Sequence, residues 1–456
     1  MPVRRRKIAK NPTAVQAPPL PTPVAIERQA YGGYGVGRCD GLVVFVPRTA
    51  PGDVVRVRLV AQRRHWAVGE VVELLTASPW RVTPPCPLYA ECGGCHLQHL
   101  AYARQLEVKT ALVRDSLARL GHLPEVPVAP TLPSPQPLAY RNKMVYHYDA
   151  ARGALGLLDR HGQRILDVPR CLLSDPRAEA AMAEVRALAA ALPPLRQVLQ
   201  QVQVQVGQRT GDVLVTLVVS APLPAATAAA LWQALQPLAS GLCLHHKRRQ
   251  TPALFAGDTV VVGGRGVIYE RFGEHLLPLT PHTFAQVNTA QTERLHQLLR
   301  EAAALRGDEV VLDLYSGSGA LAFALAPYCA RLYGVEVQPA ATRLAQQQAQ
   351  ALGFSHCTFR TGKVERLLRR YLAAGLRPDL AVLDPPRAGC RPEALEALTR
   401  LRVPRLLYVS CSPPTLARDL QRLHQLGYDI TGVQPLDMFP QTYHVECVAV
   451  LTRRSA

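Results

Sequence analysis

The chain has 456 residues, which is too long for one hydrophobic core and predicts two to four domains. Its formal net charge is +18, which favours a polyanionic partner such as a nucleic acid, because neutralised phosphates release counterions. The 11 cysteines are odd in number, and Lys10 and Pro12 interrupt any secretory apolar run after the basic start. We therefore expect a cytoplasmic monomer with reduced thiols and no membrane contact, and not a secreted disulfide protein.

The N-terminal part begins with a tail, residues 1–23, whose basic residues and prolines predict disorder. Residues 24–80 hold short apolar strands separated by glycine turns, most clearly at 43–46, 54–60 and 66–75. Five such strands predict a small barrel of the oligonucleotide-binding type. Arg63 and Arg64 come just before Trp66, a pattern that suits RNA phosphate and base contacts; a solvated hairpin tip is the alternative.

Residues 81–283 form a predicted central α+β domain whose main feature is a group of cysteines. Cys86, Cys92 and Cys95 are clustered around two glycines, and Cys171 follows 76 residues after Cys95. Four thiolates suit an iron–sulfur cluster or structural zinc, and we favour the cluster because structural zinc generally pairs two close-spaced cysteine knuckles. A helix over 98–121 is predicted to pack on the following domain. The charge-free stretch 213–232 contains two prolines and predicts a strand, a turn and a helix.

Residues 284–456 alternate strands and helices, which predicts a seven-stranded doubly wound sheet with its ligand site at the carboxyl ends of the strands. The first strand runs into DLYSGSG (313–319), where glycines allow a sharp turn and close ligand approach. The second strand ends at Glu336, where a carboxylate can bind both ribose hydroxyls of a nucleoside cofactor. Ala322 replaces the third glycine of a dinucleotide motif, so S-adenosylmethionine is favoured over NAD; a purely structural turn is the alternative.

Three further residues belong to the same predicted edge. The fourth strand ends at Asp384, which two prolines fix in place, and the fifth ends at Cys411. A thiol there faces the cofactor turn and is a candidate nucleophile, although most cysteines are small buried hydrophobes, which is our interpretation of Cys243, Cys329, Cys357 and Cys447. Glu446 lies near the start of the last strand and is a candidate general base.

These residues resemble the RNA uracil-5 methyltransferase family, in the branch with a 4Fe-4S cluster and an N-terminal TRAM domain. The resemblance extends from about Ala30 to Leu451 and rests on GGYGVGR (32–38), YRNK (140–143), FAQVN (284–288), DPPR (384–387), VSC (409–411) and FPQT with HVE (439–446). It implies a Rossmann-like class I methyltransferase domain that methylates C5 of a uridine. The substrate would be 23S ribosomal RNA, with transfer RNA as the alternative.

The resemblance also implies roles for individual residues. Cys411 would add to C6 of the uracil, and Glu446 would remove the C5 proton. The implied cofactor residues are Gln286, Tyr315, Gly317, Gly319, Ala320, Glu336 and Asp384. The implied cluster ligands are Cys86, Cys92, Cys95 and Cys171. The implied RNA contacts are Arg141, Lys143 and Phe284, in addition to Arg63 and Arg64.

Several positions depart from the family pattern. Ala320 and Ser412 stand where asparagine is usual, and Lys363 stands where an acid approaches the adenine; Gln348 and Leu352 also replace asparagines. Each lost cofactor hydrogen bond would weaken binding by ~0.5–1.5 kcal/mol. Two alternatives follow: a cytosine-5 RNA methyltransferase, which would carry a cysteine within the DPPR motif, and a non-catalytic RNA-binding protein with a decayed cofactor site.

Overall fold

The computed structural model describes residues 20, 22–247 and 257–455, so most of the predicted N-terminal tail lies outside the described residues. The chain divides into two compact units. The first comprises Met1–Ala90, Cys95–Leu112 and Gln441–His444, and the second comprises Glu91–Gly94, Val113–Pro440 and Val445–Ala456. The predicted domain boundaries at residues 80 and 283 stay predictions.

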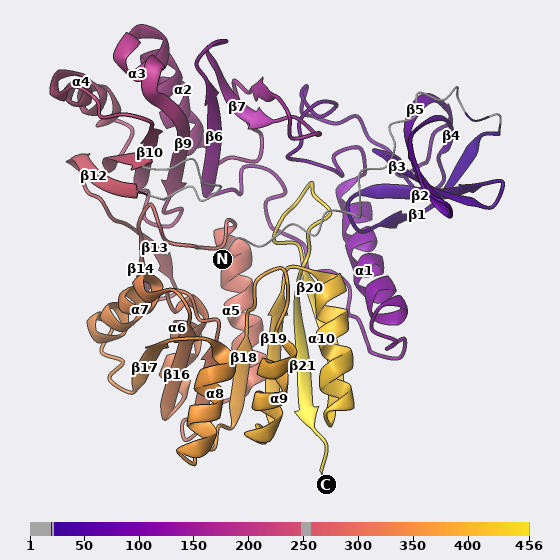
Figure 1. The fold of residues 1–456 in the computed structure, drawn as a ribbon, viewed down its shortest axis with the longest axis vertical. Coiled ribbons are helices and arrows are strands. Elements are labelled where there is room, and N and C mark those ends of the chain that lie inside the picture. Colours follow the sequence, from indigo (N-terminus) through magenta and orange to yellow (C-terminus); the bar gives the residue numbers. More distant parts are fainter. Residues whose placement is uncertain (1–19, 21, 248–256, 456) are drawn as a thin grey trace. The chain divides into compact units, whose positions relative to one another are not determined.

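The first unit contains a closed five-stranded barrel with the strand order β1-β2-β3-β5-β4, as the sequence predicts (Figure 1). Its strands are β1 (Val24–Ala30), β2 (Tyr34–Cys39), β3 (Leu42–Pro47), β4 (Val54–Gln62) and β5 (Trp66–Thr76). Buried and more exposed residues alternate along β4, because successive side chains of a strand point to opposite faces. Gly37 has no room for a side chain, since a Cβ there would lie 2.2 Å from the carbonyl oxygen of Ala25.

Helix α1 (Tyr102–Arg119) connects the two units along the chain. In the first unit its residues Val108 and Leu112 pack with Leu97 and Leu100. In the second unit its residues Val113 and Leu117 belong to the core of the C-terminal sheet. This half of the helix therefore packs on the C-terminal sheet.

The central part of the second unit is built on a seven-stranded sheet with the order β12-β11-β10-β9-β6-β7-β8. Its elements are β6 (Lys143–Asp149), β7 (Ala154–Leu158), β8 (Ile165–Asp167), α2 (Pro176–Ala191), α3 (Pro193–Val198), β9 (Leu199–Val206), β10 (Val213–Val219), α4 (Ala225–Leu235), β11 (Gly241–Lys247) and β12 (Gly257–Gly264). A separate hairpin follows, β13 (Ile268–Phe272) and β14 (His275–Leu279). Every residue of β10 is buried, so the charge-free stretch forms the predicted interior strand and helix.

The C-terminal part carries the predicted seven-stranded doubly wound sheet, with the order β17-β16-β15-β18-β19-β21-β20. Its elements are α5 (Thr289–Ala303), β15 (Val310–Leu314), α6 (Ala320–Leu325), η1 (Ala326–Tyr328), β16 (Arg331–Glu336), α7 (Pro339–Ala351), β17 (Cys357–Thr361), α8 (Val364–Ala373), β18 (Leu380–Leu383), α9 (Pro392–Arg400), β19 (Arg405–Ser410), α10 (Pro413–Gln425), β20 (Tyr428–Leu436) and β21 (Glu446–Arg453).

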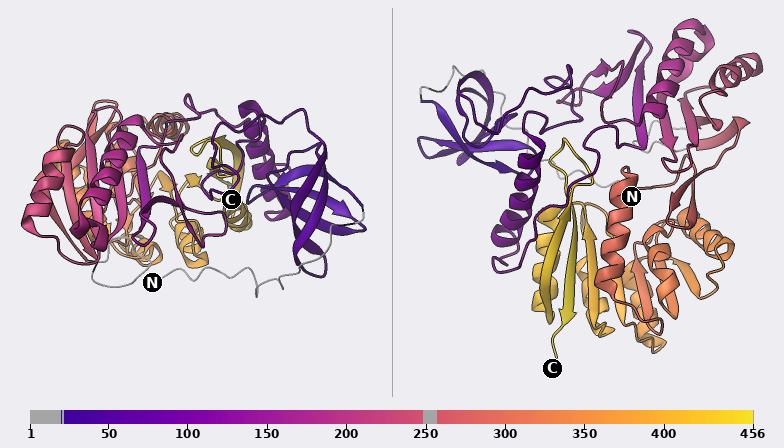
Figure 2. Two further views of the ribbon diagram at one scale, coloured as in Figure 1. Left: turned by 90° about the horizontal axis from the view of Figure 1, so that it is seen from above. Right: turned by 180° about the vertical axis from the view of Figure 1, so that it is seen from behind.

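Two layers of helices cover this sheet, which Figure 2 shows from above and from behind. Apolar residues of α5, α6 and α7 pack into one core, and those of α8, α9 and α10 pack into another. Strands β15 to β19 are parallel, whereas β21 is antiparallel to β19. The start of β21 therefore lies at the same edge as the carboxyl end of β19, where Ser410 pairs with Cys447.

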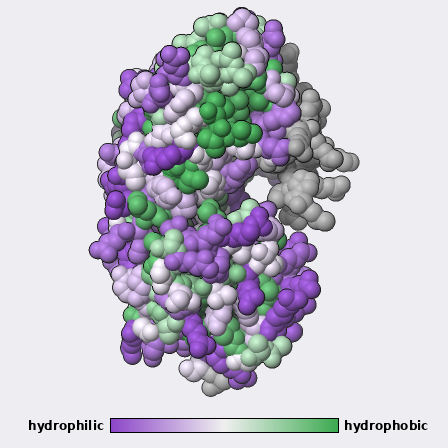
Figure 3. Space-filling view, turned by 90° about the vertical axis from the view of Figure 1, so that its left-hand side faces the viewer, coloured by the Kyte–Doolittle hydropathy of each residue, from purple (hydrophilic) through white to green (hydrophobic). Residues whose placement is uncertain are grey.

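Among the described residues, no helix combines the length and apolar character needed to cross a bilayer. The face drawn in Figure 3 mixes hydrophilic and hydrophobic residues, with one compact hydrophobic group in its upper half. Of the large aliphatic side chains in the described ranges, Val260 on β12 is the most exposed, at 62%.

Candidate active site

The glycine turn after β15 has the geometry that the sequence predicts. Gly317 and Gly319 have φ angles of +55° and +91°, a region that favours glycine. A Cβ on Gly319 would also lie 2.7 Å from the ring of Phe323. The backbone N–H of Gly317 donates to Oε2 of Glu336 at 3.1 Å, and that of Gln338 donates to Oε1 at 2.7 Å. The carboxylate of Glu336 is therefore held against the turn that would receive a ribose.

The other predicted cofactor residues lie on neighbouring loops of the same unit. Tyr315 has a positive φ of +66°, and its hydroxyl, which is close to the thiol of Cys390, has a pKa raised chiefly by burial. Ala320 begins α6 and brings no polar group to the position where an asparagine would. Asp384 follows β18, and its backbone N–H donates to the carbonyl of Leu314 at 3.2 Å. The turn, Glu336 and Asp384 thus surround the ends of three adjacent strands.

Asp313 is a site residue that the sequence interpretation did not select. It is 1% exposed at the end of β15, and burial raises its pKa to about 8, with further contributions from the charges of Asp384 and Glu336. Neither carboxylate oxygen accepts a hydrogen bond of ordinary geometry from the described residues, although the nearby N–H of Ala322 lowers the pKa somewhat. An acid directly before a glycine turn is the sequence signal that could have identified it.

Cys411 and Glu446 come together at this edge because one strand ends and its antiparallel partner begins there. Cys411 is half-buried, and burial followed by the charge of Glu446 raises the pKa of its thiol to about 11. Glu446 is 1% exposed, and burial together with the charge of Asp384 raises its pKa well above the ordinary value. Burial likewise raises the pKa of Asp384, to about 7. Burial thus favours the protonated form of each of these three side chains.

Arg387 is the positive charge beside these groups, and it was not among the predicted site residues. It lies close enough to Cys411 to lower the pKa of that thiol, and its charge also lowers the pKa of Glu446. The Arg387 side chain is exposed, so its contribution is partly screened by solvent. The arginine that ends the DPPR motif was the sequence signal that could have identified this residue.

Helix α10, which begins just after Cys411, holds the loop that carries Arg387. The hydroxyl of Thr415 donates to the Arg387 carbonyl at 3.2 Å. The carboxylate of Asp419 accepts from the hydroxyl of Tyr408 at 2.6 Å and from the backbone N–H of Cys390 at 2.7 Å. This network therefore ties the loop after β18 to strand β19.

The two motifs predicted to contact RNA and cofactor lie side by side in the second unit. The side chain of Asn142 donates to the carbonyl of Gln286 at 3.1 Å, and its N–H donates to that of Val287 at 2.9 Å. The amine of Lys143 donates to the carbonyl of Thr283 at 3.2 Å, and burial lowers its pKa to about 8. Phe284 is 77% exposed, a position suited to stacking on a base.

The remaining predicted RNA contacts lie in different places. Arg141 lies just before β6, where its backbone forms an isolated antiparallel β-bridge with that of Asn288. Arg63 and Arg64 lie in the barrel, where the N–H of Arg63 donates to the carbonyl of Trp66 at 2.8 Å in the turn between β4 and β5. They lie at the hairpin tip, and their contact with RNA stays a prediction.

The predicted cluster ligands divide between the two units. Cys86 and Cys95 belong to the first unit, whereas Cys92 and Cys171 belong to the second. Cys92 is close enough to Cys171 to raise its pKa, although burial is the larger cause of a value near 11. In the part of the chain that the structure describes, no three or more His, Cys, Asp or Glu residues form a group able to hold a metal ion.

The other cysteines behave as the sequence predicts. Those interpreted as small hydrophobes are all buried, and burial raises their thiol pKa values: Cys243, Cys329, Cys357 and Cys447.

Comparison with known proteins identifies the class. The TRAM domain family matches residues 22–72, and the tRNA (uracil-5-)-methyltransferase family matches residues 363–454. An uncharacterized RNA methyltransferase of Thermosynechococcus vestitus is 40% identical over 94% of this chain and 97% of its own length. An uncharacterized RNA methyltransferase of Halalkalibacterium halodurans is 34% identical over 94% of this chain and 96% of its own length.

A solved structure extends this similarity to the whole fold. The Pyrococcus abyssi tRNA (uracil-54, C5)-methyltransferase in complex with S-adenosyl-L-homocysteine superposes with a TM-score of 0.75 at 25% identity, covering 94% of this chain and all of that one. The chain belongs to the RNA methyltransferase family of the uracil-5 type, and it is an S-adenosylmethionine-dependent enzyme with a TRAM domain.

Proposed function

We propose that this enzyme acts in the cytoplasm and methylates C5 of a uridine in structured RNA through a covalent bond between Cys411 and C6. The observation that carries the proposal is the convergence of Cys411, Glu446 and Arg387 at one strand edge, next to the glycine turn. A nucleophile, a base and a cation that stabilises the thiolate are the three groups this reaction needs.

The reaction uses Cys411 as a thiolate and Glu446 as a carboxylate, so each gives up its proton to solvent before it acts. Cys411 first loses its thiol proton to solvent, and Arg387 stabilises the resulting thiolate. The sulfur adds to C6, and the electron pair of the C5=C6 bond moves to C5 as an enolate. S-adenosylmethionine supplies the methyl group that C5 takes. Glu446, in its carboxylate form, then accepts the C5 proton, the double bond forms again, and the sulfur leaves as a thiolate.

The first test compares two cysteine variants of the full chain. Cys411→Ala removes the sulfur that would attack C6, so methyl transfer from radiolabelled S-adenosylmethionine to RNA should vanish while RNA binding persists. Cys329→Ala, a buried cysteine in the same domain, is the control and should retain turnover. Turnover by Cys411→Ala would refute the nucleophile.

We propose 23S ribosomal RNA as the substrate, as the resemblance of the sequence implies. Transfer RNA is the second candidate, supported by the Pyrococcus abyssi enzyme, whose name specifies a tRNA uracil. Mapping 5-methyluridine in both RNAs from cells with and without this gene separates the two. Loss of a site in 23S ribosomal RNA supports the first, and loss in transfer RNA alone contradicts it.

We also propose that Cys86, Cys92, Cys95 and Cys171 bind a 4Fe-4S cluster when the protein is assembled with iron. Their spacing supports this, as does the proximity of Cys92 and Cys171. Anaerobically purified protein should be brown and contain iron; a colourless protein with one zinc would contradict the cluster.

A further inference from the structure

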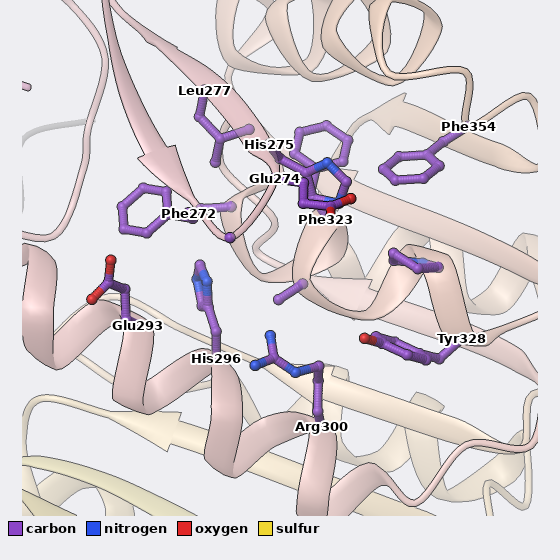
Figure 4. Close-up of a pocket in the computed structure, with 14 residues that line it drawn as sticks. Phe272, Glu274, His275, Leu277, Glu293, His296, Arg300, Phe323, Tyr328 and Phe354 are labelled. Carbon is purple, nitrogen blue, oxygen red and sulfur yellow. The ribbon is translucent and has the colours of Figure 1, made fainter. Parts of the chain in front are cut away.

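A cavity of about 410 Å³ lies among α5, the β13–β14 hairpin, α6 and the residue Phe354 that follows α7 (Figure 4). One of its described lining residues, Ala320, is also a predicted cofactor residue. Cys411 and Glu446 do not line the cavity. The volume is in the range of small-molecule sites. The cavity therefore borders the predicted cofactor turn but contains neither of the two side chains proposed to act on the uracil.

The walls of the cavity are largely aromatic. The rings of Phe272 and His296 have centroids 5.2 Å apart, and those of His275 and Phe354 are 5.3 Å apart. Figure 4 shows Tyr328 on the side of the cavity away from Phe272, and its side chain is 49% exposed. Aromatic walls of this kind favour a flat, unsaturated ring, because stacking and edge contacts supply the attraction.

His296 gives the cavity a polar group with no partner of its own. It is 4% exposed, and Nε2 makes no hydrogen bond with the residues that the structure describes. Figure 4 shows its imidazole projecting from α5 toward Phe272. Burial lowers the pKa of His296 to about 4, so the ring is neutral near pH 7. A neutral ring nitrogen suits a hydrogen bond to the uncharged edge of a heterocycle.

Two charges at the opening define the rest of the ligand. Arg300, one turn further along α5, is exposed and forms no ion pair within the described ranges. The Glu293 carboxylate is already paired with Arg209 at 2.6 Å. Glu274, exposed at the hairpin, offers an acceptor that fits an exocyclic amino group. A guanidinium that is free to bind beside an aromatic cavity suits a phosphate attached to a base.

We propose that this cavity binds a nucleotide, with the base between the aromatic walls, its polar edge at His296 and its phosphate at Arg300. The same chemistry describes a free nucleoside monophosphate and one nucleotide of a bound RNA strand. The second source rests on the proposed function, because the strand would belong to the RNA substrate.

The test measures the contribution of Arg300 to phosphate binding. Full-length protein saturated with S-adenosylhomocysteine, which occupies the cofactor site, is titrated calorimetrically with AMP and with adenosine. AMP should bind more tightly than adenosine, and Arg300→Ala should weaken AMP about tenfold, as expected for one charge-assisted hydrogen bond, while leaving adenosine unchanged. Arg294→Ala removes an exposed cation of the same helix outside the cavity and should change neither affinity.

A six-residue oligoadenylate separates the two sources. AMP binding that depends on Arg300 assigns the cavity to a free nucleotide, and oligoadenylate binding with the same dependence but no AMP binding assigns it to the RNA strand. Equal affinities of wild type and Arg300→Ala for every probe overturn the proposal. Cys411→Ala should keep this binding although it transfers no methyl group. Wild-type protein that binds AMP through Arg300 but methylates no uridine would contradict only the proposed function.

Discussion

The reactivity of Cys411 depends on the charges around it, and Arg387 is the one that favours the thiolate. Burial and the charges of Glu446 and Asp384 raise the pKa of the thiol to about 11, while the positive charge of the nearby Arg387 opposes them. Arg387→Gln should therefore raise that pKa further and make the sulfur less reactive.

The size of the effect is that of one lost contact between the guanidinium and the thiolate, for which a charge-assisted hydrogen bond sets the upper range. A hydrogen bond to a charged group contributes ~1.5–3 kcal/mol, and one pKa unit corresponds to ~1.4 kcal/mol. Because the Arg387 side chain is exposed and screened, we take the lower end, about one pKa unit. Near pH 9 about 1% of a thiol with a pKa near 11 is ionised, so the variant should hold about tenfold less thiolate.

Alkylation by iodoacetamide between pH 8 and pH 10 measures this directly, because the thiolate is the reacting form. Peptide mass spectrometry isolates the reaction of Cys411 from that of the other cysteines. Arg387→Lys keeps the charge and should lose less reactivity than Arg387→Gln, and Arg391→Gln, an exposed residue four positions along the chain, should react like wild type. Equal alkylation rates for wild type and Arg387→Gln would refute the assigned role.

Three further predictions test the surroundings of the site. The folded protein binds a proton on Asp313 more tightly than the unfolded chain does, so its contribution to stability is lost as the pH rises from about 4 to about 8. The difference in unfolding free energy between Asp313→Asn and wild type, measured by urea denaturation, should therefore shift in favour of the variant from pH 5 to pH 9. A difference that stays constant with pH would contradict the raised pKa of Asp313. Asp419→Asn weakens the acceptor for Tyr408 and Cys390, so it should cost ~1.5–3 kcal/mol of stability and also slow the alkylation of Cys411; unchanged alkylation would show that the network does not position Arg387. Affinity for RNA should fall steeply as salt increases, which filter binding can measure, and a flat response would argue against binding by the basic surface.

The sequence by itself determined the outline of both β-rich parts. Short apolar runs between glycine turns predicted the barrel, and the alternation of strands and helices predicted the C-terminal sheet. The edge of that sheet followed too, because parallel strands bring their carboxyl ends together. Gly317, Glu336 and Asp384 could thus be assigned to one edge before any coordinates, since each follows or ends a strand.

Only the tertiary structure decided which charges act on the thiol. Glu446 reaches Cys411 because β21 runs antiparallel to β19, a pairing that local sequence periodicity does not specify. Arg387 and Asp419 gain their importance from contacts between loops and helices that are distant in sequence, and burial, not residue type, raises the pKa of Asp313. The proposed nucleotide cavity likewise arises from several elements, the β13–β14 hairpin, α5, α6 and the residue after α7, because close packing brings their side chains together only in the folded chain.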